Sequence, residues 1–331
     1  MNSRPMHLAA ALILVLLPVK ASLAEPPSSA RQWLERMIQA AHALNYDGIF
    51  MYVQGQNLEA MHVIHQGGAG TERQRLVSLN GPLREVVVAD QHVICVVPAQ
   101  PTALGGYRRS PFPITLSPKL DELAANYEFN LLGEDRVAGL NTQVIAIQPR
   151  DKLRFGYRLW LEAETGMILR SALFDEAGHL LEQMMFTSVQ FKREIDPALF
   201  ALPPSTPPLT PATAPESKPP VEKAVQSAWT LLESDLPRGF TRVMHNRLPA
   251  DSGRPTAEHI VLTDGLATVS IFLEPLAGAE PLLQGPAQMG AMNAFGTLLK
   301  DHQVLVVGEV PQVTVQMIAG ALHAAQESAA K

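Results

Sequence analysis

The chain has 331 residues, of which 47% are hydrophobic and 18% charged, and its formal net charge is −6. This length exceeds what one hydrophobic core usually fills, so the composition indicates a globular protein of two domains and excludes a largely disordered chain. The acidic balance argues against a nucleic-acid partner, because binding to phosphates requires clustered lysine and arginine.

The first 24 residues have the three parts of a secretory signal peptide. Arg4 supplies a positive charge, residues 8–19 form an apolar run, and residues 22–24 (SLA) provide a small-residue cleavage site. The apolar run has about 12 residues, whereas a membrane-spanning helix needs roughly 20, which favours a cleaved signal over a retained membrane anchor. We therefore expect residues 1–24 to be removed on export. We expect no lipidation, since no cysteine stands at the cleavage site.

One amphipathic helix and then many strands are predicted for residues 25–201. Residues 29–44 place apolar side chains at intervals of three and four, with Ser28 or Ser29 available as N-cap. A second, short helix is expected at residues 117–127, where Pro118 suits the first helical position. Segments rich in β-branched and aromatic residues, bounded by turn residues, predict an antiparallel sheet with strands at residues 46–54, 58–66, 72–79, 84–89, 91–97, 144–148, 155–162, 167–174 and 180–191.

About nine strands and only two helices leave more apolar sheet surface than the helices can cover. Curling of the sheet into a half-barrel solves this problem and can enclose an apolar ligand. Four methionines, Met51, Met61, Met184 and Met185, add flexible side chains that suit variable acyl chains. Ordinary core filling is the alternative interpretation of each methionine.

Residues 202–221 are predicted to be an interdomain linker, because a proline-rich stretch with almost no large apolar residue cannot pack a core. A proline-rich recognition ligand is the competing interpretation. Residues 222–331 then form a smaller block, with hairpins predicted at residues 258–274 and 294–310 and a helix at residues 313–325. The fold class is therefore α+β, a curled antiparallel half-barrel with helices followed by a smaller antiparallel sheet packed with a helix.

The sequence contains no motif that supports catalysis. It has no nucleophile elbow, no phosphate-binding glycine loop and no zinc-protease helix. His62 and His65 are three residues apart in a predicted strand, so they point to opposite faces and cannot share a metal ion unless the strand is broken. The one cysteine, Cys95, lies in an apolar strand as a small hydrophobe, with a redox or intermolecular-disulfide role as the alternative. We expect no enzyme, cofactor or metal site.

Ordered sequence stretches across both blocks resemble those of the RseB/MucB family. In the first block they are WL at 33–34, LNY at 44–46, GPLREVV at 81–87, YRLWL at 157–161, TGMILR at 165–170 and LLEQ at 180–183. In the second block they are W at 229, LPRGF at 236–240, TDGL at 263–266 and VVGEVP at 306–311. The proline-rich stretch lies where the family has its linker, although it is longer than is usual there.

The resemblance implies a periplasmic negative regulator of the envelope-stress sigma-E-type factor. It implies a first domain similar to the LolA and LppX lipoprotein carriers. It also implies binding to the periplasmic region of an RseA/MucA-type membrane anti-sigma factor, which is thereby shielded from site-1 protease. Lipopolysaccharide or mislocalised lipoprotein would relieve this binding. Whether the protein forms a homodimer is left open.

Such a regulator needs a cavity for acyl chains and a groove or edge for an extended partner segment. The candidate cavity lining is Phe50, Tyr52, Met61, Leu159 and Met185. The candidate partner-binding residues are Arg238, Arg242 and Arg247. Core packing for the first set and a solvated basic face for the second are the alternatives. A periplasmic lipid or lipoprotein carrier of the LolA type is the competing function, and a periplasmic hydrolase is a third.

Overall fold

The computed structural model describes residues 27–68, 72–89, 92–96, 116–201, 227, 229–248, 250 and 256–324, with the backbone alone for 89, 92–96 and 324. The predicted signal peptide and the proline-rich linker lie outside these residues. The side chain of Cys95 does as well.

Ten antiparallel strands form the first sheet, in the order β5-β4-β3-β2-β1-β10-β9-β8-β7-β6. Consecutive strands pair within β1–β5 and within β6–β10, and the pairing of β1 with β10 joins these two meanders. The bounds are β1 Tyr46–Gln54, β2 Asn57–Gln66, β3 Arg73–Ser78, β4 Glu85–Ala89, β5 His92–Val96, β6 Tyr127–Val137, β7 Leu140–Pro149, β8 Gly156–Glu162, β9 Ile168–Phe174 and β10 Leu180–Phe191.

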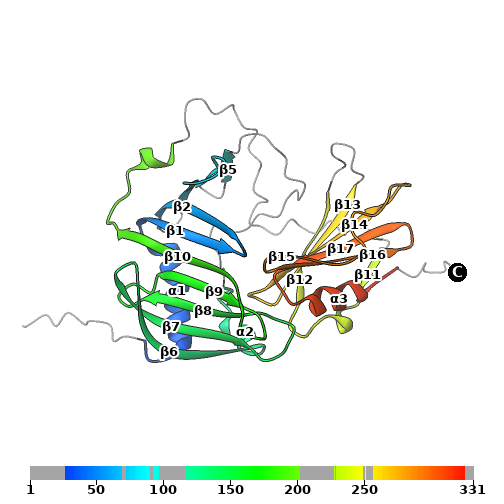
Figure 1. Ribbon diagram of the computed structural model, residues 1–331, viewed down its shortest axis with the longest axis horizontal. Helices are drawn as coiled ribbons and strands as arrows, with labels where there is room; N and C mark the ends of the chain where they lie inside the picture. The colour runs from blue at the N-terminus through cyan, green and yellow to red at the C-terminus, as the bar shows by residue number, and fades with distance from the viewer. Residues whose placement is uncertain are drawn as a thin grey trace, which may run out of the picture.

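Helix α1 (Ala30–Ala43) packs against one face of this sheet (Figure 1). It starts where predicted, because Ser29 and Gln32 form a capping box at its N-terminus. Its buried residues Trp33, Leu34 and Met37 join side chains of β1, β2 and β6–β10 in one apolar cluster. We call the face that they cover the inner face of the first sheet. A short helix α2 (Leu120–Ala124) precedes β6, and a 3-10 turn at Pro197–Phe200 follows β10.

The second sheet has six antiparallel strands in the order β12-β13-β14-β17-β16-β15. Helix α3 (Gln312–Gly320) packs on it through Val315 and Ile318, both fully buried in the second apolar cluster. The bounds are β12 Thr241–Leu248, β13 Ala257–Thr263, β14 Thr268–Pro275, β15 Gly285–Met289, β16 Met292–Leu299 and β17 His302–Gly308, with a separate pair β11 Trp229–Leu231 and β18 Leu322–Ala324 and a 3-10 turn at Glu233–Asp235. The predicted α+β fold class is confirmed.

A buried histidine ties the end of α1 to β2. His65 is 2% exposed, and its ring nitrogens lie 2.8 Å from the Leu44 carbonyl oxygen and 3.1 Å from Glu72 Oε1. His42 Nδ1 lies 3.1 Å from the other Glu72 oxygen, and the Tyr46 ring stacks on His65 with 4.9 Å between centroids. His62, on the opposite face of β2, pairs with Asp47 at 2.7 Å. His62 and His65, which were predicted to point to opposite faces of the strand, therefore have separate partners.

The contacts of the Glu72 carboxylate with His65 and His42 predict that this residue affects how stability changes at acidic pH. Hydrogen bonds from His65 and His42 hold the pKa of Glu72 below its ordinary value of 4.5. Because the pKa is depressed in the folded state, the stabilisation is present above the unfolded pKa and is lost as the pH falls through the folded pKa. We expect Glu72→Gln to lower the urea midpoint at pH 7 and to flatten its decline below about pH 4.5. The control is Glu134→Gln on the exposed part of β6. An acid decline as steep in the Glu72 variant as in the parent contradicts the prediction.

Candidate functional site

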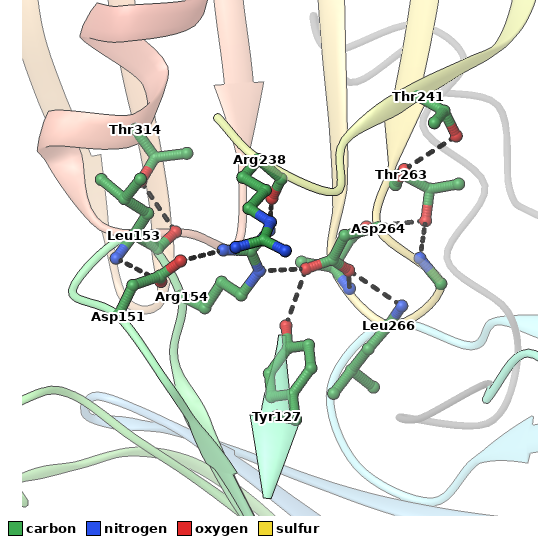
Figure 2. Close-up of polar contacts among 12 residues, drawn as sticks. Tyr127, Asp151, Leu153, Arg154, Arg238, Thr241, Thr263, Asp264, Leu266 and Thr314 are labelled. Carbon is green, nitrogen blue, oxygen red and sulfur yellow. Dashed lines mark hydrogen bonds and ion pairs between the residues drawn. The ribbon is translucent and has the colours of Figure 1, made fainter. Parts of the chain in front are cut away.

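The two sheets meet in a polar junction built from four separate segments. Figure 2 shows the start of β6, the loop 150–155 between β7 and β8, the turn 237–240 before β12, and the turn between β13 and β14 converging there. At its centre are Arg154 from the first block and Asp264 from the second. Both side chains have no solvent-exposed surface.

Arg154 uses each of its three nitrogens at this junction. Its Nε donates to Asp264 Oδ2 at 2.5 Å, and its two terminal nitrogens donate to the Asp151 carboxylate and to the main-chain carbonyl of Arg238. The guanidinium also lies over the rings of Tyr127 and Phe240, 5.8 and 5.1 Å from their centroids. A buried cation is tolerable only when it is paired and hydrogen-bonded in this way.

Both carboxylate oxygens of Asp264 likewise accept hydrogen bonds. Its Oδ2 accepts from Arg154 and from the Tyr127 hydroxyl at 2.9 Å, while Oδ1 accepts from the main-chain nitrogens of Leu266 and Ala267 at 3.0 and 2.8 Å. Burial, and then the adjacent Asp264 charge, raise the pKa of Tyr127 far above its ordinary value. Tyr127 therefore keeps its proton and stays a donor to the carboxylate.

Further contacts fix the two blocks around this pair. The Ser117 nitrogen donates to the Gly265 carbonyl at 3.0 Å, and the Thr314 hydroxyl donates to the Leu153 carbonyl at 2.8 Å. Gly239, with φ +88°, packs so closely on Asn126 that a Cβ at this position would overlap the amide. The junction is thus a specific, desolvated contact between the blocks.

An open groove of about 690 Å³ borders this junction. It runs between the β7–β8 loop and the β9–β10 turn and includes Asp151, Lys152, Arg158 and Glu176. The Arg158 guanidinium covers the Phe174 ring at 4.6 Å from its centroid. Charges of both signs line the groove, so it is suited to a polar segment with mixed charges more than to an acyl chain.

The predicted partner-binding arginines lie along the start of the second block. Arg238 contributes its carbonyl to Arg154, while its own side chain belongs to the exposed turn. Arg242 and Arg247 lie on β12, an edge strand, and pair with Leu262 and Glu258, which places both on one face of the second sheet. Arg247 Nη2 lies 3.9 Å from Glu258 Oε1. The structure thus groups Arg242 and Arg247 and places Arg238 at the junction.

Most of the predicted lining residues share the inner face. Phe50, Met61 and Leu159 are buried in the cluster beneath α1, and half-buried Tyr52 donates its hydroxyl to Glu182 at 2.6 Å. Met185 pairs across the strands with Met51 and Arg170 and therefore lies on the opposite face.

Arg154, Asp264 and Tyr127 were missed by the sequence reasoning. The one local signal was the Asp264-Gly265 turn, which predicted a hairpin and not an ion pair. Within the ranges described above, no three His, Cys, Asp or Glu residues gather as a metal site. No helix in those ranges is both long and apolar enough to cross a bilayer.

Comparisons with known proteins account for both blocks. The MucB/RseB N-terminal domain model matches residues 29–204, and the MucB/RseB C-terminal domain model matches residues 223–323. The chain belongs to the MucB/RseB family. It is 33% identical over 319 residues to the sigma factor AlgU regulatory protein MucB of Pseudomonas aeruginosa, covering 93% of this chain and 95% of that protein.

Other MucB/RseB proteins match over similar lengths. The sigma-E factor regulatory protein RseB of Escherichia coli is 26% identical over 301 residues, which are 89% of this chain and 90% of RseB. The fold is similar to that of MucB in the solved complex of Pseudomonas aeruginosa MucA/MucB, with a TM-score of 0.69, 28% identity, and coverage of 89% of this chain and 98% of that one. Arg154 lies within the residues that match the N-terminal domain model, and Asp264 lies within those that match the C-terminal domain model. Their ion pair therefore joins the two regions.

Proposed function

We propose that this protein is a periplasmic regulator that binds the periplasmic region of a membrane anti-sigma factor and shields it from site-1 protease. The observation that carries the proposal is the similarity to MucB as solved with MucA, which extends over both domains and nearly the whole of that chain. The predicted signal peptide at residues 1–24 supports the periplasmic location.

The structure offers surfaces that suit an extended partner segment. β12 is an edge strand of the second sheet, and among the described residues only β13 pairs with its backbone within that sheet. Arg242 and Arg247 add positive charge on one face of this strand, and Arg238 adds charge in the turn before it. A peptide with acidic residues could pair with such an edge and its arginines, which supports these three residues as partner contacts.

We further propose that an amphiphile with acyl chains binds at the inner face of the N-terminal domain. Phe50, Tyr52, Met61 and Leu159 lie on this face and are the proposed lining. Lipopolysaccharide or mislocalised lipoprotein would be the source of the chains. If the amphiphile and the anti-sigma segment favour different states of the protein, each weakens the binding of the other by the same factor.

Protease protection tests this function. The mature chain is mixed with the periplasmic segment of its anti-sigma factor and site-1 protease, and cleavage is followed over time. We expect cleavage to slow at saturating protein. Arg242→Glu combined with Arg247→Glu should weaken protection about tenfold or more, since reversed charges repel an acidic segment. Arg136→Glu on the exposed edge of β6 is the control. Unchanged cleavage at saturating wild-type protein rules the function out.

A lipid or lipoprotein carrier is the second candidate, because the curled apolar sheet suits a carrier as well. The two functions differ in their need for residues 222–331. A carrier predicts lipid transfer between vesicles by the intact chain together with undetectable binding of the anti-sigma segment. The regulator predicts tight binding of that segment.

A further inference from the structure

Two hairpin tips of the C-terminal domain take part in the core of the N-terminal domain. Ala291, between β15 and β16, is fully buried and belongs to the same apolar cluster as α1 and the inner face. Leu266, in the turn between β13 and β14, packs against that cluster as well. Figure 1 shows the β15–β16 hairpin directed at the end of β1. We call residues 263–267 and 289–292 the two hairpin tips.

Close packing holds each tip in place. Gly290 has φ +60°, and a Cβ built there would lie 2.6 Å from the Gln54 Cγ. Gln54 is the last residue of β1, and its amide donates to Glu182 at 3.3 Å beside the Tyr52 hydroxyl. A Cβ on Gly265 would lie 3.7 Å from a methyl carbon of Leu123, itself 1% exposed in the first core.

The tips cover one end of the curled sheet. Strand register places the β1–β2 turn and the β9–β10 turn at the same end, since Gln54 pairs with Glu182 and Val53 with Gln183. The β7–β8 loop with Arg154 lies at this end too, because Gly156 pairs with Phe174. The inner face is therefore bounded at this end by another domain, which the Arg154–Asp264 pair holds in place.

We propose that the C-terminal domain closes the acyl-chain site of the N-terminal domain, and that the two hairpin tips and an acyl chain compete for this end of the inner face. The inference rests on the amphiphile site proposed above. It adds a way in which an acyl chain bound to the N-terminal domain changes the position of the C-terminal domain, which carries the proposed partner contacts. Lifting the tips exposes Ala291, Leu266 and the apolar surface beneath them to water. A chain that fills the vacated end restores the apolar contacts and so favours the open arrangement.

The test compares four full-length mature proteins: the wild type, Ala291→Asp, Leu266→Ser and Met289→Asp. The last is the matched control, because Met289 lies two residues from Ala291 but is 61% exposed. The probe is a dansyl-labelled undecanoic acid, whose fluorescence rises in an apolar site. Circular dichroism and thermal unfolding verify that each variant folds. Because two tip variants are tested, the comparison still holds if one of them does not fold.

We expect the probe to bind Ala291→Asp and Leu266→Ser about tenfold more tightly than it binds the wild type or Met289→Asp. This factor corresponds to a wild type in which roughly a tenth of the molecules are open. Binding of the probe to the wild type should also raise amide hydrogen exchange at residues 289–292. Equal affinities in all four proteins, no probe binding to any of them, or unchanged exchange on binding would each overturn the proposal. Protease protection by the wild type is measured separately, so the regulator function can survive this result.

Discussion

Replacement of Asp264 with alanine should lower the free energy of unfolding by about 3–5 kcal/mol, the typical cost of removing one partner of a buried ion pair. The loss is large because Arg154 is fully buried and would keep its charge with only the partly exposed Asp151 carboxylate left as a partner. Tyr127 would lose its acceptor, and the main-chain nitrogens of Leu266 and Ala267 would lose theirs. A buried donor without an acceptor carries its full desolvation penalty.

Urea unfolding of the wild type, Asp264→Ala, Arg154→Met and the double variant measures this effect as a double-mutant cycle. The double variant should be less destabilised than the sum of the two single variants, because it leaves no unpaired charge behind. Asp301→Ala is the control, since that aspartate side chain is 82% exposed beside His302. Its effect should stay within about 0.5 kcal/mol. If Asp264→Ala costs no more than this control, the pair does not stabilise the junction.

Elements with strong periodicity were predictable, whereas β6, β12 and β15, three of the four edge strands of the two sheets, were not. Helix α1 and the strands β1 to β5 follow from regular apolar spacing and turn residues, which reflect burial of one face. Strand β6 was not predicted, because it is an edge of its sheet and exposes most of its middle residues, so that YEFNLLGEDRV shows no alternation. The two edge strands β12 and β15 of the second sheet were missed too, and β15 also contains Pro286.

The junction could not be predicted for a different reason. Arg154 and Asp264 are 110 residues apart, and nothing in their local sequence distinguishes them from other charged residues in turns. Arg238 shows the same limit. Its positive charge predicted a partner contact, which stays a prediction, but nothing in the sequence indicated that its main-chain carbonyl would accept from Arg154, since every residue has this group. The family resemblance predicted two domains without describing how they are joined.

Leu159 and Met185, both predicted from the sequence to line the cavity, should respond to truncation in two distinct ways. Leu159→Ala should cost about 2–5 kcal/mol, because Leu159 is fully buried in the cluster beneath α1 and its removal leaves a cavity. Met185→Ala should cost about 1 kcal/mol or less, since this side chain lies on the opposite face of the sheet and is partly exposed.

Urea unfolding measures the two stabilities, and binding of the dansyl fatty acid shows whether the inner face takes a chain. A chain that enters beside Leu159 would occupy the space left by truncation, so the probe should stabilise Leu159→Ala more than it stabilises Met185→Ala. Equal stabilisation of both variants by the probe would show that the acyl chain does not bind beside Leu159. A stability loss in Leu159→Ala as small as in Met185→Ala would show that the leucine borders open space. Only in that case would the inner face be an open cavity before any ligand enters, and the hairpin tips would then have no packed core to complete.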